Sequence, residues 1–157
     1  MTDREKGLAQ LRKAVARIDQ VLVPWGFRFD LGENDLSSPG GYACGFYRRG
    51  STRIGLICRA NYGLGCVEYE YETITDDGFV RESVRYGLDH TGYMQRVGHD
   101  RDCLLIEEEL SAIARDGGDP VDALIHDLSE YAAPTLRQEC PEFLAIIRSG
   151  YRRTKVL

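Results

Sequence analysis

The residue types best suited to chemistry gather in one segment of this chain. Between residues 89 and 103 the sequence places six potential metal ligands, namely Asp89, His90, His99, Asp100, Asp102 and Cys103. Zinc sites usually present their ligands in close pairs such as C-x-x-C or H-x-x-x-H, and this segment has no such pair. A solvated loop with two ordinary histidines is the simpler interpretation. The alternative is a small enzyme with its site in the 87–103 loop, which could use a metal ion.

Paired carboxylates offer a second chemistry, general acid and base catalysis. Glu68 with Glu70, or the run at residues 107–109, could supply an acid and a base. Alternate side chains on a strand face lie roughly 7 Å apart and point into solvent, so their pKa values have little reason to diverge. Three consecutive glutamates on a helix surface cannot converge on one point. Neither set therefore predicts a catalytic site.

Signatures of cofactor and redox chemistry are also missing from the sequence. Gly63-Leu-Gly65 falls in an expected hairpin turn and is not followed by a helix, so it lacks the context of a phosphate-binding loop. The five cysteines are odd in number, scattered, and contain no C-x-x-C pair. They are typical of reduced, mostly buried thiols and not of a disulfide framework. We expect no cofactor and no metal.

Length and composition indicate one soluble domain spanning residues 1–157. Of the 157 residues, 43% are hydrophobic and 29% are charged, which are values of globular proteins. The polar N-terminus MTDREKGLAQ has no apolar segment after it, and no run approaches the roughly 18 apolar residues of a membrane span. We therefore expect a cytoplasmic protein with no membrane contact.

The net charge of −5 hides a division along the chain. Residues 1–59 hold ten basic and six acidic residues, residues 60–136 hold five and 17, and residues 137–157 hold five and two. Nucleic-acid binding requires a basic face that displaces counterions from phosphates, and an acidic middle segment argues against it. The same segment favours a basic protein as partner.

The elements expected to position these residues begin with a helix. Thr2 and Glu5 fit a capping box, and an apolar stripe with spacings of three and four follows. The stripe comprises Leu8, Leu11, Val15, Ile18 and Leu22. Pro24 and Gly26 end this helix.

Three stretches of alternating residues then predict an antiparallel meander. The alternating sets are Tyr42, Cys44 and Phe46; Ile54, Leu56 and Cys58; and Val67, Tyr69 and Tyr71. If the second and third sets share the core face, the numbers of two residues that lie directly opposite each other must add to an odd value. A sum of 125 would pair Arg53 with Glu72, and a sum of 127 would pair Arg59 with Glu68. Either register places Glu68, Glu70 and Glu72 on the outer face.

After a turn at residues 75–78, residues 79–86 are expected to form a fourth strand and residues 87–101 an irregular loop. Helical patterns follow at residues 103–116, at residues 121–132 behind the N-cap pair Asp119-Pro120, and at residues 141–149. The tail YRRTKVL is basic. The predicted fold is α+β: an N-terminal helix, an antiparallel meander of three to five strands, and C-terminal helices packed on one sheet face.

The acidic strand CVEYEYE carries the functional expectation. A solvated outer sheet face is the plain interpretation of its three glutamates. The more specific interpretation is that the three glutamates form a negative surface flanked by tyrosines. Such a surface can steer and hold a basic partner. The residues expected to bind that partner are Glu68, Glu70, Glu72, Tyr62, Asp76 and Asp77.

The layout resembles small bacterial immunity-type domains, the cytoplasmic antidotes of polymorphic toxin systems. The matching features are a helix ending in PWGF, the strands CGFYRRG and IGLICR, and the helices DPVDALIHDLSEYAAP and CPEFLAIIRSGYR. The resemblance implies a non-enzymatic inhibitor that covers a toxin's active site, often with acidic surface against a basic nuclease. It carries no functional residue over to this chain. A homo-oligomeric structural protein is a third interpretation.

Overall fold

A computed structural model describes residues 2–31, 42–61, 63–98 and 116–157. The helices are α1 (Asp3–Leu22), α2 (His90–Arg96), α4 (Pro120–Asp127), the π-helical segment η2 (Leu128–Ala132), α5 (Ala133–Leu136) and α6 (Pro141–Arg148). The strands are β1 (Arg28–Asp30), β2 (Tyr42–Arg49), β3 (Thr52–Arg59), β4 (Gly63–Asp76), β5 (Arg81–Asp89) and β6 (Tyr151–Val156).

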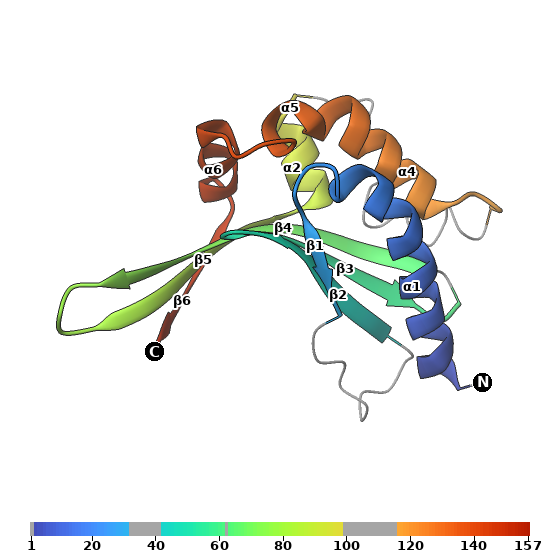
Figure 1. The fold of residues 1–157 in the computed structure, drawn as a ribbon, viewed down its shortest axis with the longest axis horizontal. Coiled ribbons are helices and arrows are strands. Elements are labelled where there is room, and N and C mark those ends of the chain that lie inside the picture. Colours follow the sequence, from blue (N-terminus) through green and yellow to red (C-terminus); the bar gives the residue numbers. More distant parts are fainter. Residues whose placement is uncertain (1, 32–41, 62, 99–115) are drawn as a thin grey trace.

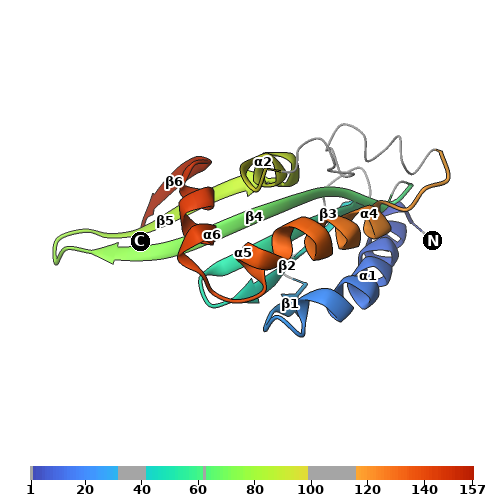
Figure 2. The ribbon, with the colours of Figure 1, turned by 90° about the horizontal axis from the view of Figure 1, so that it is seen from above.

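The described strands form one antiparallel sheet in the order β1-β2-β3-β4-β5-β6. The helices lie on one face of this sheet, and the strands arch beneath them, as Figures 1 and 2 show. We call the other face, which no described helix covers, the bare face. The α+β class, the N-terminal helix, the antiparallel sheet and the C-terminal helices are as predicted, but the expected three to five strands are six and the chain ends on a strand. The two short edge strands, β1 and β6, account for the difference.

Helix α1 begins and ends where the sequence predicts. Thr2 Oγ1 accepts from the backbone N–H of Glu5, and the Glu5 carboxylate accepts from the backbone N–H of Thr2, which completes the capping box. The buried face is centred on Leu11, Ile18 and Leu22, each 0% exposed. Tyr47 in β2 donates from its hydroxyl to Asp19 Oδ1 at 2.7 Å, which ties the helix to the sheet.

The register between β3 and β4 differs from both predicted registers. Arg53 lies opposite Glu70, and Gly55 lies opposite Glu68. The pairing shifts between Ile57 and Cys58, where Gly65 is an extra residue in β4. This bulge lets Leu64 face the core without turning the glutamates inward. The parity argument therefore holds and Glu68 stays on the bare face, but the predicted partners of Arg53 and Arg59 were wrong.

The core face of β2 is formed by Ala43 and Tyr47, which are 2% and 0% exposed. The alternating set noted in the sequence, Tyr42, Cys44 and Phe46, lies on the bare face. In β3 and β4 the apolar sets face the core as predicted, with Ile54, Leu56, Cys58, Val67 and Tyr69 all buried.

The irregular loop expected at residues 87–101 is largely regular structure. Residues 87–89 complete β5, and α2 begins directly after them, with the Asp89 carboxylate accepting from the N–H of Gly92. The helix expected at residues 103–116 lies almost entirely outside the described residues. Asp119 and Pro120 begin α4 as predicted, with the Asp119 carboxylate accepting from the N–H of Val121.

The basic tail is a strand because two glycines let the chain come very close to β5. A Cβ added at Gly150 would lie 2.0 Å from the carbonyl oxygen of Gly87, and one at Gly87 would lie 2.3 Å from the Tyr151 ring. Gly150 directly follows α6 and its C-cap residue and precedes β6. The absence of a side chain at this crossing therefore lets β6 pair with β5.

We predict that Gly150→Ala lowers the free energy of unfolding by about 2 kcal/mol or more, because the new methyl group overlaps backbone that cannot move aside. Chemical denaturation measures this change. Gly55→Ala is the matched control, since its Cβ would meet the Phe46 ring at an ordinary 3.4 Å. Equal stability of the two variants would contradict the close approach of β6 to β5.

Candidate functional site

The three strand glutamates lie on the bare face within a network of opposite charges. We call Arg53, Glu70, Glu72 and Arg85 the ion cluster. Arg85 Nη2 lies 2.9 Å from Glu72 Oε2, and Arg85 Nε lies 3.4 Å from Glu70 Oε2. Arg53 Nη1 lies 3.6 Å from Glu72 Oε2 and 4.0 Å from Glu70 Oε2. Two arginines from neighbouring strands therefore flank two glutamates of β4.

Neighbouring side chains cover much of this cluster. The Arg53 guanidinium lies over the Phe46 ring, 4.0 Å from its centroid. The side chains of Arg53 and Glu70 are 10% and 8% exposed, and that of Glu72 is 33% exposed. Ser83 donates from its hydroxyl to Glu72 Oε1 at 3.0 Å. Glu70 is therefore held inside the molecule, and Glu72 offers only part of its carboxylate to a partner.

Glu68 occupies a different electrostatic environment on the same strand face. Burial, and next to it the charge of Glu70, raise the pKa of Glu68 above its ordinary value. The Tyr151 hydroxyl lies 3.4 Å from Glu68 Oε2 and 3.3 Å from Glu70 Oε1. Hydrogen bonds from Arg85 are the largest influence on Glu72 and lower its pKa. The pKa of Glu68 is thus raised by burial and by Glu70 on its own strand, whereas the pKa of Glu72 is lowered by Arg85 of the neighbouring strand.

The other two predicted acidic residues lie at the tip of the hairpin formed by β4 and β5. Asp77 Oδ1 accepts from the backbone N–H groups of Phe79 and Val80, at 2.9 and 2.8 Å. Asp76 Oδ1 accepts from the N–H of Gly78 at 2.9 Å. The bonds from Val80 and, next, Phe79 lower the pKa of Asp77, so its carboxylate stays charged. Tyr62, the remaining predicted residue, lies outside the described residues.

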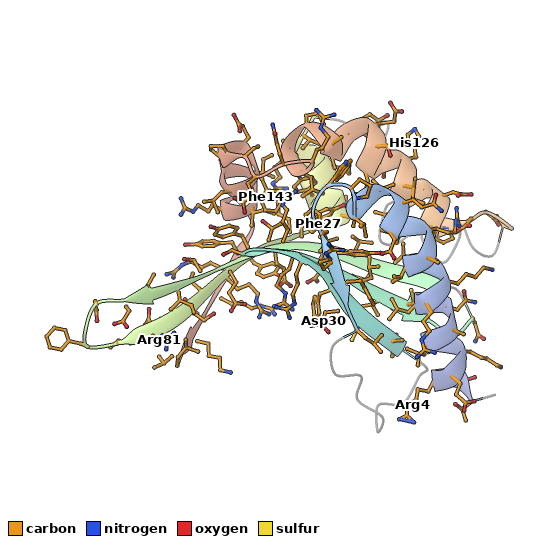
Figure 3. The ribbon with its side chains drawn as sticks, viewed as in Figure 1. Arg4, Phe27, Asp30, Arg81, His126 and Phe143 are labelled. Atoms are coloured by element: carbon orange, nitrogen blue, oxygen red, sulfur yellow. The ribbon has the colours of Figure 1, made fainter. Side chains whose placement is uncertain are left out.

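The tip also carries an aromatic residue that the sequence pattern predicts to lie in a strand. Phe79 is 94% exposed and Val80 is 41% exposed. The hairpin extends away from the helices and the core (Figure 1). Figure 3 shows Arg81 on this arm, well apart from Phe27 and Phe143 between sheet and helices. We call Asp76, Asp77, Phe79 and Val80 the hairpin tip.

A second polar cluster is buried under the helices. Tyr69 Oη lies 2.7 Å from His90 Nδ1, and His90 Nε2 lies 2.9 Å from Asp127 Oδ2. Asp127 Oδ1 lies 3.2 Å from His126 Nδ1. The sequence placed His90 in a candidate enzyme loop, but nothing in its spacing indicated Tyr69 or Asp127 as partners.

The buried cluster is suited to holding the fold together. Tyr69 and Asp127 are 0% exposed and His90 is 3% exposed, so a substrate could not touch these groups. The Tyr93 ring stacks on Tyr69 with centroids 4.3 Å apart. The cluster thus links β4, α2 and α4 through groups whose hydrogen bonds satisfy one another.

The described residues do not form a metal site of the kind that the enzyme interpretation requires. Among them, no three His, Cys, Asp or Glu side chains come together in a way that could hold a metal ion. His99, Asp100, Asp102 and Cys103 lie outside the described residues. Burial raises the pKa of the Cys58 thiol to about 12, so that thiol stays protonated.

Comparison with known protein families, curated proteins and solved structures finds no match for this chain. Within the described ranges, no helix has both the length and the apolar character needed to cross a membrane.

We predict that removing the charge of Glu72 and removing the charge of Glu68 have opposite effects on the free energy of unfolding. Glu72→Gln should lower the free energy of unfolding by about 1 kcal/mol at pH 7, because Arg85 stabilises the ionised form. A lowered folded-state pKa stabilises the protein above the ordinary value near 4.5, and this stabilisation is lost as the pH falls through the lowered pKa. The difference from the wild type should therefore shrink toward zero in acid.

Glu68→Gln is the matched variant for this experiment. The raised pKa of Glu68 means that ionisation opposes folding above the ordinary value of 4.5, so the variant should equal or exceed the wild type in stability at pH 7. Denaturant titrations across the acid range compare the two. Effects of the same sign and the same pH dependence at both positions would contradict the described network.

We also predict that Asp127→Ala lowers the free energy of unfolding by about 3 kcal/mol or more, because it leaves His90 buried without its acceptor. Asp122→Ala on the same helix is the control. Its side chain is 70% exposed, and its partner Arg17 also pairs with Asp119. We expect a loss of about 1 kcal/mol or less for the control. A similar loss in both variants would show that the buried cluster contributes no special stability.

Proposed function

We propose that this protein is a non-enzymatic cytoplasmic module that binds and inhibits a basic protein, in the manner of immunity-type domains. The single observation that carries the proposal is the exposed Phe79 at the end of a projecting, acidic hairpin. Aromatic residues, phenylalanine among them, are enriched at the centres of protein interfaces, and Phe79 stands beside the partly exposed Val80 and two aspartates.

The tip has the properties of a preorganised docking element. The carboxylates of Asp76 and Asp77 fix the turn through three backbone hydrogen bonds, so little conformational freedom remains to be lost on binding. Both side chains are exposed on their outer sides and carry negative charge toward a partner. A rigid acidic knob with an apolar end fits a concave site lined with basic residues, such as the cleft of an enzyme that binds an anionic substrate.

The rest of the predicted acidic site takes a smaller part in this proposal. Glu70 serves the ion cluster, and Glu72 shares its carboxylate with Arg85, so neither offers a free charge. The negative charge that steers the partner is therefore that of Asp76 and Asp77 at the tip. The mechanism is steric cover with electrostatic steering, and it involves no bond making and no cofactor.

We predict that Phe79→Ala weakens partner binding by about 2 kcal/mol, or roughly thirtyfold, because the truncated tip loses its apolar anchor. Affinity capture from the source cells supplies the partner, and calorimetric titration with the purified partner gives the change in affinity. Asp77→Asn keeps the acceptor that holds the turn and removes only the charge. It should weaken binding less at high salt than at low salt.

Tyr42→Ala is the control for the loss of an exposed aromatic side chain. Tyr42 is 44% exposed and lies on the bare face in β2, away from the hairpin. We expect the wild type and this control to capture the same basic protein and to suppress its activity equally. An unchanged affinity of Phe79→Ala for that protein, or a captured partner without a basic surface, would overturn the proposal.

A further inference from the structure

We infer that the outer edge of β6 binds an acidic, extended segment of another protein, which adds to the sheet as a seventh strand beside β6. Backbone hydrogen bonds along the edge hold such a strand, and its side chains determine which sequence binds. This site is separate from the hairpin tip, whose proposed partner is basic, so either interaction can occur without the other.

β6 is the long open edge of the sheet. The strand order places β1 at one edge and β6 at the other, and within the described ranges no strand lies beyond either of them. β1 has only three residues, whereas β6 pairs with β5 over six consecutive residues without a bulge. β6 also contains no proline, which would interrupt the pairing of an added strand. The edge can therefore accept a strand along its whole length.

Alternate residues of β6 direct their backbone groups away from β5. The N–H of Leu157 donates to the carbonyl oxygen of Arg81 at 2.8 Å, which continues the pairing of the two strands beyond the end of β6. In an antiparallel pair, residues bonded to the neighbouring strand alternate with residues whose N–H and C=O point to the opposite side. The outward residues are therefore Arg152, Thr154 and Val156, which are exposed. Their N–H and C=O groups are available to an added strand.

The side chains beside this edge determine the charge of its partner. Arg152, Arg153 and Lys155 are exposed, and β6 contains no acidic residue. Among the described residues, none of these three bases lies within ion-pair distance of a carboxylate. Arg85, opposite Arg153 in β5, is itself basic and is already paired with Glu72. The edge therefore presents uncompensated positive charge, which favours carboxylates on the added strand.

The bare face of β6 predicts the spacing of those carboxylates. Arg85 lies on the bare face as part of the ion cluster, so Arg153 opposite it and Lys155 two residues further lie on the same face. There they line a groove of about 630 Å³ together with Ile74 and Leu157, and this groove leaves them open to a partner. Alternate residues of an added strand share one face. Acidic residues at every second position of that strand therefore place carboxylates beside both charges.

A second copy of this chain is a poorer occupant of the same edge. Two β6 strands paired side by side would bring the bases of one copy against those of the other, which opposes the pairing. Basic residues on an edge strand are a common protection against such self-association. They do not oppose a strand of opposite charge, so the charges of β6 select an acidic partner.

The test uses the purified full-length chain and a fluorophore-labelled, end-capped peptide of about eight residues, in which glutamate alternates with threonine or valine. A peptide with lysine in place of each glutamate is the matched control. We expect the glutamate peptide to bind with a Kd of about 100 µM or lower, measured by fluorescence anisotropy, and about tenfold more weakly at high salt. We expect no binding of the lysine peptide.

Hydrogen exchange distinguishes an added strand from a loose attraction between charges. Saturation with the glutamate peptide should slow the exchange of the outward amides of Arg152, Thr154 and Val156 by about tenfold or more. The amides of Arg153 and Lys155 already bond to β5, so their exchange should change less. A peptide held by charge alone would not produce this alternation.

Variants of β6 separate the contribution of the backbone from that of the charges. Thr154→Pro removes one outward N–H and leaves the bonds to β5 in place, so it should weaken binding about tenfold or more. Arg153→Glu combined with Lys155→Glu should abolish binding of the glutamate peptide and allow binding of the lysine peptide. The charge variant decides the inference alone if the proline variant does not fold. Arg28→Glu, on the exposed β1 edge, is the control and should bind as the wild type does.

Failure of the glutamate peptide to bind, equal binding of the lysine peptide, or unchanged exchange of the three outward amides would each overturn the inference. A folded Thr154→Pro variant with normal affinity would also overturn it. Tighter binding of a short single-stranded DNA than of the peptide would show that β6 recognises phosphate and not an acidic strand. None of these outcomes bears on the inhibitor proposal, which is decided by the affinity of the Phe79→Ala variant for the captured partner.

Discussion

The pairing of the Glu70 carboxylate with Arg53 and Arg85 is the interaction on which the bare face depends. A carboxylate with little exposure is costly unless opposite charges accompany it. Arg53 comes from β3, directly opposite Glu70, and Arg85 comes from β5, opposite Glu72. The cluster therefore forms in a single register of three strands. A slip of one residue would place the glutamates under the helices, so charge pairing and core packing select the same register.

The ion cluster also decides where the surface can act on another molecule. At the centre of the bare face, the charges of β4 are balanced by arginines of the neighbouring strands, so an incoming protein would have to replace bonds that already exist. The unbalanced charges lie along the arm formed by β4, β5 and β6. Asp76 and Asp77 stand at its tip, and Arg153 and Lys155 line its groove. The sequence of β4 looks uniformly acidic, yet the bare face is neutral at its centre. Its charged and partly apolar regions lie at its periphery.

Local signals in the sequence predicted most of the elements. The capping box and apolar stripe defined α1, and alternation defined β2, β3 and β4. The register failed mainly because β4 begins at Gly63, a residue that the sequence assigned to the turn, so the two strands pair closer to the turn than expected. Gly65 then adds a bulge that no alternation pattern marks. β6 was missed because its basic residues resemble a solvated tail, and the cause of its pairing is the close approach of Gly150 to Gly87.

The candidate sites were less predictable than the elements because they join distant parts of the chain. His90 and Asp127 are 37 residues apart, and no motif connects them. Glu68, Glu70 and Glu72 were placed on the correct face, but their pairing depends on arginines in two other strands. Phe79 was assigned to a strand, whereas the strand begins two residues later at Arg81 and leaves the ring in the turn.

A double-mutant cycle between Arg53 and Glu70 tests this account most directly. The free energy of unfolding is measured for the wild type, Arg53→Met, Glu70→Gln and the double variant, with the exposed pair Arg48 and Asp30 as reference. We predict a coupling of about 1–3 kcal/mol for Arg53 and Glu70, and a value within about 0.5 kcal/mol of zero for the reference. A coupling near zero for both pairs would show that the bare face is not organised around Glu70.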